Sequence, residues 1–178
     1  MTTEIIIAGF GGQGIQSMGK IIASAGMLMD KKVSWLPSYG PEMRGGTSNC
    51  HVIVSDELIG SPILNDCDAL IVMNGPSLDK FEKYVRQGGV IIIDSTMINN
   101  DVKRNDVKVF KIPATQMALE YGNPTYAGVI LLGKLLKETN VVTERGFEEG
   151  LKYSLPAKKH GLIPEEMDAL MKGSSYGL

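Results

Sequence analysis

A glycine-rich segment near the start of the chain constrains its fold more than any other feature. Glu4–Ala8 is a short β-branched run of the kind found in buried strands, and it leads directly into Gly9–Phe10–Gly11–Gly12–Gln13–Gly14. Apolar residues then recur at helical spacing over residues 13–30: Met18, Ile21, Ile22, Ala25, Leu28 and Met29. A strand, a tight glycine turn and an amphipathic helix in this order predict the opening unit of a Rossmann-like α/β fold.

The next part of the chain alternates strands with a helix. A helix is expected over Pro76–Gln87, with Gly88 and Gly89 as its stop. Val90–Asp94 is almost entirely apolar, as in a parallel sheet that is covered on both faces. Short apolar runs predict strands at Val33–Leu36, Thr47–Ser55, Ala69–Met73, Val90–Asp94 and Val107–Ile112.

From Ala114 onward the pattern is helical. Tyr126–Leu136 is so apolar that most of it must be buried, and Phe147 and Leu151 mark a further helix. Pro164–Glu165–Glu166 has the proline and the acidic residues that suit a first helical turn. We therefore predict a single domain over residues 1–178. Its fold class is α/β: Rossmann-like, with an open, mostly parallel sheet, helices on both faces and a helical C-terminal segment.

Charge and hydropathy exclude several classes of function. The chain has 18 Lys and Arg against 20 Asp and Glu, a net charge of −2, so it has no electrostatic reason to bind nucleic acid or an anionic membrane. Apolar stretches such as Val129–Leu132 are far shorter than the ~20 residues of a membrane-spanning helix. Glu4 stands where a signal peptide needs positive charge. We expect a cytoplasmic protein with no nucleic-acid or membrane partner.

The two cysteines, Cys50 and Cys67, do not indicate a metal centre. A disulfide is not expected in a reducing compartment, and zinc or iron–sulfur sites usually need four ligands. His51 follows Cys50 directly, so on a strand the two side chains would point to opposite faces. We expect both cysteines to be buried or half-buried strand residues and this chain to bind no metal.

The glycine segment also predicts a phosphate-binding loop. It fits G-x-G-x-x-G, in which glycines let a phosphate approach backbone N–H groups at the positive end of the following helix. A dinucleotide site should add an Asp or Glu near the end of the second strand, about 20 residues on, but that strand ends at Ser34–Leu36. The half-present pattern favours another phosphate-bearing ligand over NAD. Alternatively, the glycines only let the strand and the helix pack closely.

A second loop, Pro37–Gly46, has the unusual sequence PSYGPEMRGG. Its two prolines and three glycines indicate a rigid, shaped loop rather than a solvated linker. It presents the hydroxyls of Ser38 and Tyr39, the carboxylate of Glu42 and the guanidinium of Arg44. An arginine fork suits carboxylate or phosphate groups, but Glu42 and Arg44 could equally pair with each other and only shape the loop.

Taken together, the two loops resemble the gamma subunit, or fused gamma domain, of pyruvate, 2-oxoglutarate and related 2-oxoacid:ferredoxin oxidoreductases. PSYGPEMRGG is the most specific part of a resemblance that covers about the first three-quarters of the chain and weakens beyond Lys137. It continues in order through Val54–Asp56, Ser61–Pro62, Gly88–Gly89, Ile93–Ser95, Ile112–Thr115, Gly122–Asn123 and Leu132–Gly133.

The resemblance implies a non-metal subunit that does not catalyse alone. In such enzymes a 2-oxoacid and coenzyme A give acyl-CoA and CO2, and electrons pass to ferredoxin; thiamine diphosphate, Mg and [4Fe–4S] clusters belong to the partner subunits. The implied partners are alpha-, beta- and delta-type subunits, with ferredoxin reached through the complex. This chain would help to bind coenzyme A and close the active site. Its candidate contacts are Gly11, Gly12, Gln13, Gly14, Ser38, Tyr39, Glu42 and Arg44.

Other interpretations remain open from the sequence. The chain could be the partner subunit of an indolepyruvate-type oxidoreductase, a free-standing dinucleotide-dependent oxidoreductase, or a structural subunit whose glycine loop packs against a neighbour. The missing ribose acid counts against the second. Asp56 and Asp94 each follow an apolar strand and could face the same edge as the glycine loop, although capping roles are expected. The identity of the 2-oxoacid stays open.

Overall fold

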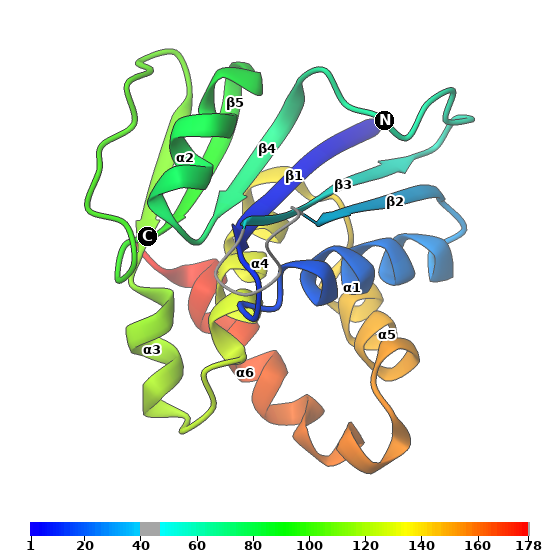
Figure 1. Cartoon of the computed structure of the whole chain (residues 1–178). Coiled ribbons are helices and arrows are strands. Elements are labelled where there is room, and N and C mark those ends of the chain that lie inside the picture. Colours follow the sequence, from blue (N-terminus) through cyan, green and yellow to red (C-terminus); the bar gives the residue numbers. More distant parts are fainter. Residues whose placement is uncertain (40–46, 178) are drawn as a thin grey trace.

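A computed structural model describes residues 1–39 and 47–177, so Glu42 and Arg44 lie outside the described residues. Within them, six strands form one sheet in the order β2-β3-β1-β4-β5-β6 (Figure 1). The strands are β1 Thr2–Phe10, β2 Lys32–Tyr39, β3 Thr47–Ser55, β4 Cys67–Val72, β5 Val85–Asp94 and β6 Lys108–Ile112. All the strands expected from the sequence are present at these places.

The sheet is mixed but mostly parallel. Of these six strands, β3 alone runs against the others: it pairs antiparallel with both β1 and β2. The pairs β1–β4, β4–β5 and β5–β6 are parallel. The predicted fold class is confirmed, with one departure from a dinucleotide-binding unit. There the second strand lies beside the first, whereas here β3 lies between β1 and β2.

Helices cover both faces of the sheet. On one face lie α1 and α4, with α5 packed on α1 and α6 packed on α4. On the other face lies α2, followed by a 3₁₀ segment, Glu82–Tyr84. The helices are α1 Ile15–Leu28, α2 Gly75–Phe81, α3 Ala114–Glu120, α4 Tyr126–Thr139, α5 Glu144–Ser154 and α6 Ile163–Ser175. The helical C-terminal segment is therefore confirmed.

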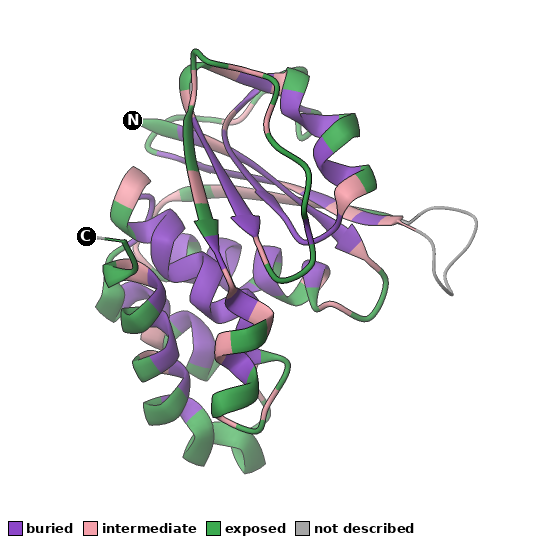
Figure 2. Ribbon diagram, turned by 90° about the vertical axis from the view of Figure 1, so that its left-hand side faces the viewer, coloured by how far each residue is buried: buried purple, intermediate pink, exposed green. Residues whose placement is uncertain are grey.

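The core has one layer on each face of the sheet, because successive strand residues point to opposite sides. Ile5 and Ile7 of β1 face α1 and α4, whereas Ile6 and Ala8 face α2. The central strands are buried along most of their length (Figure 2). Every residue of Tyr126–Leu136 is buried as predicted, which makes α4 the central helix of its layer.

The predicted end of α2 is wrong. The helix stops at Phe81 and β5 already begins at Val85, so Gly88 and Gly89 are not a helix stop. They lie in an irregular part of β5, where the pairing with β4 shifts register between Cys67 and Ala69. Gly88 has φ 77°, and a β-carbon on Gly89 would lie 2.8 Å from two backbone oxygens. The glycines are needed for this bulge.

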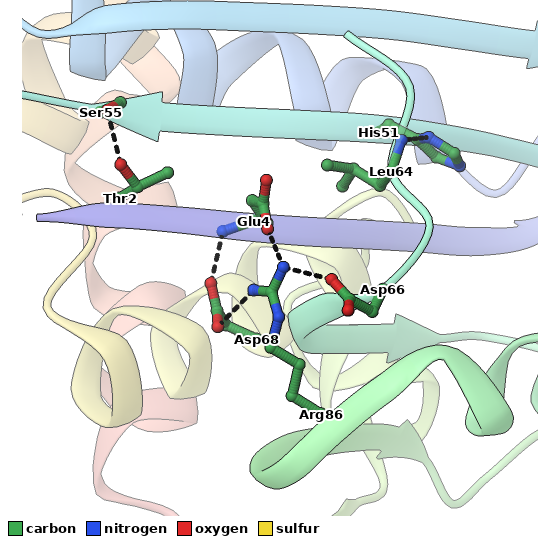
Figure 3. A network of polar contacts seen from close by, with 8 residues as sticks. All are labelled: Thr2, Glu4, His51, Ser55, Leu64, Asp66, Asp68 and Arg86. Atoms are coloured by element: carbon green, nitrogen blue, oxygen red, sulfur yellow. Dashed lines mark hydrogen bonds and ion pairs between the residues drawn. The ribbon is translucent and has the colours of Figure 1, made fainter. Parts of the chain in front are cut away.

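Arg86 projects from the bulge into a polar network at the amino edge of the sheet (Figure 3). Its guanidinium pairs with Glu4 and Asp66, and its Nη1 donates to Oδ1 of Asp68 at 2.7 Å. Asp68 also accepts a 2.8 Å hydrogen bond from the backbone N–H of Glu4. The network ties β1 to the starts of β4 and β5, at the end of the sheet away from the glycine loop.

Asp56 also lies at this amino edge, because β3 is antiparallel and Ser55 pairs with Thr2. The expectation that Asp56 could face the glycine loop is therefore wrong. Its carboxylate pairs with Lys31, and this hydrogen bond is the main cause that lowers the pKa of Asp56 to about 2.

Cys50 in β3 and Cys67 in β4 are fully buried, as predicted. Burial raises the pKa of both thiols to about 12. In the part of the chain that the structure describes, no group of three His, Cys, Asp or Glu side chains could hold a metal ion. None of the helices in residues 1–39 and 47–177 has the length and hydropathy needed to cross a membrane.

Candidate functional site

The glycine loop lies where the connections of the sheet change face. The chain leaves β1 for α1 on one face, whereas it leaves the adjacent strand β4 for α2 on the other (Figure 1). The carboxyl ends of β1 and β4 therefore meet at a topological switch point. In open α/β sheets this crevice is the usual place for a ligand.

The loop offers its backbone to solvent. Gly11, Gly12 and Gly14 are exposed, and Gly12 and Gly14 have φ values of 89° and 78°, which favour glycine strongly. Gly14 caps α1, and in the described structure no side chain caps the first turn and no acidic residue lies in it. The positive end of a 14-residue helix is thus open to an anion.

Gln13 has its side chain turned into the molecule. Its Oε1 accepts a 2.6 Å hydrogen bond from the backbone N–H of Phe10, and its Nε2 donates to the carbonyl oxygen of Met73 at 3.1 Å. Gln13 therefore cross-links the β1–α1 loop to the end of β4. The structure thus gives this amide a loop-shaping role. The ligand contact expected from the sequence stays a prediction, and Gln13 also lines the adjoining pocket.

Gln16 brings the end of β2 toward the glycine loop. Its Nε2 donates to Oγ of Ser48 at 2.9 Å and to the carbonyl oxygen of Asn49 at 2.8 Å, and it lies 3.5 Å from the carbonyl oxygen of Ser38. The exposed Ser38 thus lies beside the first turn of α1, as it must if Ser38 and the glycine loop are to contact the same ligand. Tyr39 ends β2 next to it. Gln16 was not identified from the sequence, because a polar residue in a first helical turn is ordinary.

A pocket of about 300 Å³ adjoins the loop. It is bounded by the starts of α1 and α4 and by the segment that leads into α6. The first turns of α4 and α6 lie side by side, and the hydroxyl of Tyr126 donates a hydrogen bond to Oε2 of Glu165 at 2.7 Å. The lining comprises Gln13, Gly14, Ser17, Met18, Ile21, Asn123, Thr125, Gly128, Val129, Leu132, Leu155, Lys159, Leu162 and Glu166.

Glu166 is the acidic residue of this lining. Its side chain belongs to the first turn of α6, as the sequence predicted, but it is only 8% exposed. Burial raises the pKa of its carboxyl group, and Lys159 acts in the opposite direction. The sequence pattern could not show that one of two adjacent glutamates turns inward.

Asp94 and Asn74 lie at the carboxyl ends of β5 and β4, outside the glycine loop. The fully buried carboxylate of Asp94 accepts hydrogen bonds from the backbone N–H of Thr96, at 3.1 Å, and from Oγ1 of Thr115, at 2.5 Å. These bonds close the turn after β5 and tie it to the first turn of α3, but Asp94 is not the N-cap residue of that helix, which is Pro113. Asn74, which the sequence did not single out, caps α2 by accepting from the N–H of Ser77 at 2.8 Å.

The pyruvate ferredoxin/flavodoxin oxidoreductase family matches residues 4–176. The chain belongs to this family. A ketoisovalerate oxidoreductase subunit VorA of Methanothermobacter thermautotrophicus is 39% identical over 174 residues, 97% of this chain but 36% of VorA. A 2-oxoglutarate synthase subunit KorC of Methanocaldococcus jannaschii is 37% identical over 159 residues, 88% of this chain and 85% of KorC. The chain thus spans about a third of the VorA-type relatives and most of the KorC type.

Solved structures of this family have the same fold. The gamma subunit of a keto/oxoacid ferredoxin oxidoreductase from Geobacter sulfurreducens has a TM-score of 0.82 at 27% identity, over 97% of this chain and 98% of that one. A 2-oxoglutarate:ferredoxin oxidoreductase from Magnetococcus marinus has a TM-score of 0.87 at 24% identity, over 98% of this chain and 30% of that one. The predicted resemblance to gamma-type subunits is confirmed.

Proposed function

We propose that this chain is the coenzyme A-binding gamma subunit of a cytoplasmic 2-oxoacid:ferredoxin oxidoreductase. In this proposal partner subunits of alpha, beta and delta type carry thiamine diphosphate, Mg and [4Fe–4S] clusters. The complex converts a 2-oxoacid and coenzyme A into acyl-CoA and CO2 and passes electrons to ferredoxin. The gamma chain contributes the coenzyme A site and closes the approach to the reacting centre.

The observation that carries the proposal is the open glycine loop at the switch point. Gly11, Gly12 and Gly14 leave backbone N–H groups accessible at the start of α1, where a diphosphate would be stabilised by hydrogen bonds and by the helix dipole. Coenzyme A carries a diphosphate and a 3′-phosphate. Ser38 lies on the β2 side of the loop, and with Tyr39, Glu42 and Arg44 it would line the path of the thiol toward the partner subunit.

The relatives support the same assignment. The Magnetococcus structure has 2-oxoglutarate, coenzyme A and succinyl-CoA bound, and the part of it that resembles this chain is about a third of its length. The likeness to VorA covers a similar share of that protein. We therefore propose that this chain takes part in the reaction only together with other domains or subunits.

A free-standing dinucleotide enzyme is disfavoured by the sheet order. In that fold the acid that holds the ribose stands at the end of the strand next to β1. Here the neighbour is the antiparallel β3, which begins rather than ends at this edge, with Thr47 opposite Phe10. The indolepyruvate-type alternative differs in substrate, so the oxoacid preference of the assembled enzyme separates it from the proposal.

The test is to purify the tagged chain with its native partners and to assay reduction of a viologen dye. We expect reduction that requires both a 2-oxoacid and coenzyme A, together with co-purifying thiamine- and cluster-bearing chains. Dye reduction that does not depend on coenzyme A, or a chain that purifies alone and binds NADH, would overturn the proposal.

A further inference from the structure

The loop that joins β3 to β4, residues 56–66, carries large apolar side chains on its outer side. Leu58 is 88% exposed, more than any other large apolar side chain in the described residues, and Ile63 is 64% exposed. One exposed apolar residue is ordinary, but two in one short loop form a surface that binding would explain. The loop lies at the amino edge of the sheet, at the opposite end from the glycine loop (Figure 1).

The loop is anchored, so the exposure of these two side chains does not come from a loosely held segment. Each is followed by a residue that packs into the core on the α2 side of the sheet: Ile59 after Leu58, and Leu64 after Ile63. The backbone N–H of Leu64 donates to Nδ1 of His51 at 3.2 Å (Figure 3). An apolar surface that is already held in place loses little conformational entropy when it binds.

The surroundings of the loop are negatively charged. Arg86 pairs with the carboxylates of Glu4, Asp66 and Asp68, so three carboxylates against one guanidinium leave an excess of two negative charges (Figure 3). Glu57, in the loop itself, is exposed and forms no ion pair within residues 1–39 and 47–177. Charges at the rim of an interface favour a partner of the opposite sign.

We propose that residues 56–66 are the docking surface for a partner subunit whose contacting face presents apolar side chains flanked by Lys or Arg. The inference rests on the proposed function, because it takes the partner to be a subunit of the same complex. Leu58 and Ile63 would form the apolar centre of the interface, and the carboxylates around them its polar rim. Docking at the amino edge leaves the glycine loop, at the carboxyl edge, free to face the reacting centre.

Other occupants of this surface are disfavoured by its charge. In a symmetric dimer of this chain the same patch would meet itself, so Glu57 and the unneutralised carboxylates would face their own copies and repel. An anionic membrane would be repelled for the same reason. A basic partner face instead relieves the excess of negative charge.

The test measures how tightly the chain is held in the assembled complex. The complex is diluted and the Kd for release of this chain from its native partner chains is determined by mass photometry. The double variant Leu58→Ser/Ile63→Ser should raise this Kd about tenfold or more, because the apolar centre of the interface is lost. Leu119→Ser on α3 and Tyr153→Ser on α5 are matched controls, since these side chains are 56% and 62% exposed outside the loop. They should keep the wild-type Kd within about twofold.

Charge reversal tests the chemistry of the partner face. Glu57→Lys should raise the Kd about threefold or more, because an attraction becomes a repulsion, and added salt should weaken the wild-type complex by screening. Glu120→Lys, at the exposed end of α3, is the control and should have no such effect. At concentrations above the Kd, all these variants should keep the wild-type KM for coenzyme A, because the loop lies away from the glycine loop.

Three results would overturn the inference. The double serine variant could keep the wild-type Kd, the two controls could weaken the complex as much as it does, or Glu57→Lys could tighten binding, which would mean an acidic partner face. In each case a complex whose activity still requires coenzyme A would leave the proposed function standing. A chain that purifies without partner chains would instead remove the proposed function together with the inference.

Discussion

The side-chain amide of Gln13 donates a 3.1 Å hydrogen bond to the backbone carbonyl of Met73, 60 residues away in the sequence. The same side chain accepts from the N–H of Phe10, so one residue closes the glycine loop and fixes it to the neighbouring strand. The loop is therefore held in place by a side chain within the motif, while its glycines stay open. This division of roles leads to the first prediction.

Gln13→Ala should lower the free energy of unfolding by about 1–3 kcal/mol, because the N–H of Phe10 and the carbonyl of Met73 lose their partner in a half-buried place. Gln13→Glu should be no better, since it keeps an acceptor for Phe10 but puts a carboxylate oxygen against the carbonyl. Chemical denaturation provides the measurement. The exposed Gln116→Ala serves as the control and should stay within about 0.5 kcal/mol of wild type.

The contact between α4 and α6 gives a second prediction. A β-carbon on Gly173 would lie 1.8 Å from the carbonyl oxygen of Ile130, and one on Gly133 would lie 2.0 Å from that of Leu170. Both obstacles are backbone atoms, which cannot move aside as a flexible side chain can. Gly173→Ala should therefore cost at least the ~1–3 kcal/mol typical of overpacking.

Gly161→Ala is the matched control for that substitution. A β-carbon at Gly161 meets no atom within 4 Å, and its φ is not in the left-handed region. It should change the free energy of unfolding by less than about 0.5 kcal/mol. Equal stability of the two alanine variants in denaturant titrations would show that the two helices are not packed backbone to backbone.

The sequence predicted those parts of the fold that depend on local pattern. Glu4–Ala8 and Val90–Asp94 are apolar on both faces and became buried central strands, and Tyr126–Leu136 became a buried helix. It could not predict that β3 runs antiparallel between β1 and β2, because a strand has the same pattern in either direction. Gly88–Gly89 misled for a related reason: two glycines suit a helix stop and a bulge equally well.

The site was predictable to a similar extent. The glycine motif located the open loop because its meaning depends on neighbouring residues in the sequence. The pocket beside it was missed, since Ser17, Asn123 and Glu166 come from three distant segments. Which of Glu165 and Glu166 turns inward depends on the rotation of α6 against α4, and that is set by tertiary packing.

The pH dependence of stability tests the inward position of Glu166 without any ligand. Its pKa is raised in the folded protein, mainly by burial, so as pH rises from about 4 the unfolded chain loses this proton before the folded chain does. The contribution of this group to stability is therefore complete below the unfolded pKa and is lost as pH rises through the folded pKa.

Glu166→Gln removes that titration. We expect the variant to match the wild type in thermal stability near pH 4 and to exceed it near pH 7, whereas Glu165→Gln should show no such growing difference. A variant that is less stable than wild type at pH 7 would mean that the carboxylate has a partner in the folded state.

A substitution at Ser17 tests whether phosphates bind at the start of α1 without destabilising the fold. It is exposed, lies in the first turn of α1 and borders the pocket. An aspartate there interacts favourably with the helix dipole, by about 0.3–1 kcal/mol, but repels a phosphate bound at the same place. Ser17→Asp should therefore keep or raise the melting temperature and raise the KM for coenzyme A about tenfold or more.

Ser17→Asn, which has the same shape without the charge, separates repulsion from steric blocking. It should leave the KM for coenzyme A close to that of the wild type, and added salt should reduce the effect of the aspartate by screening. If both variants raised the KM equally, the effect would be steric. If neither did, the phosphates would bind elsewhere, and the open end of α1 would serve only to join the glycine loop to its helix.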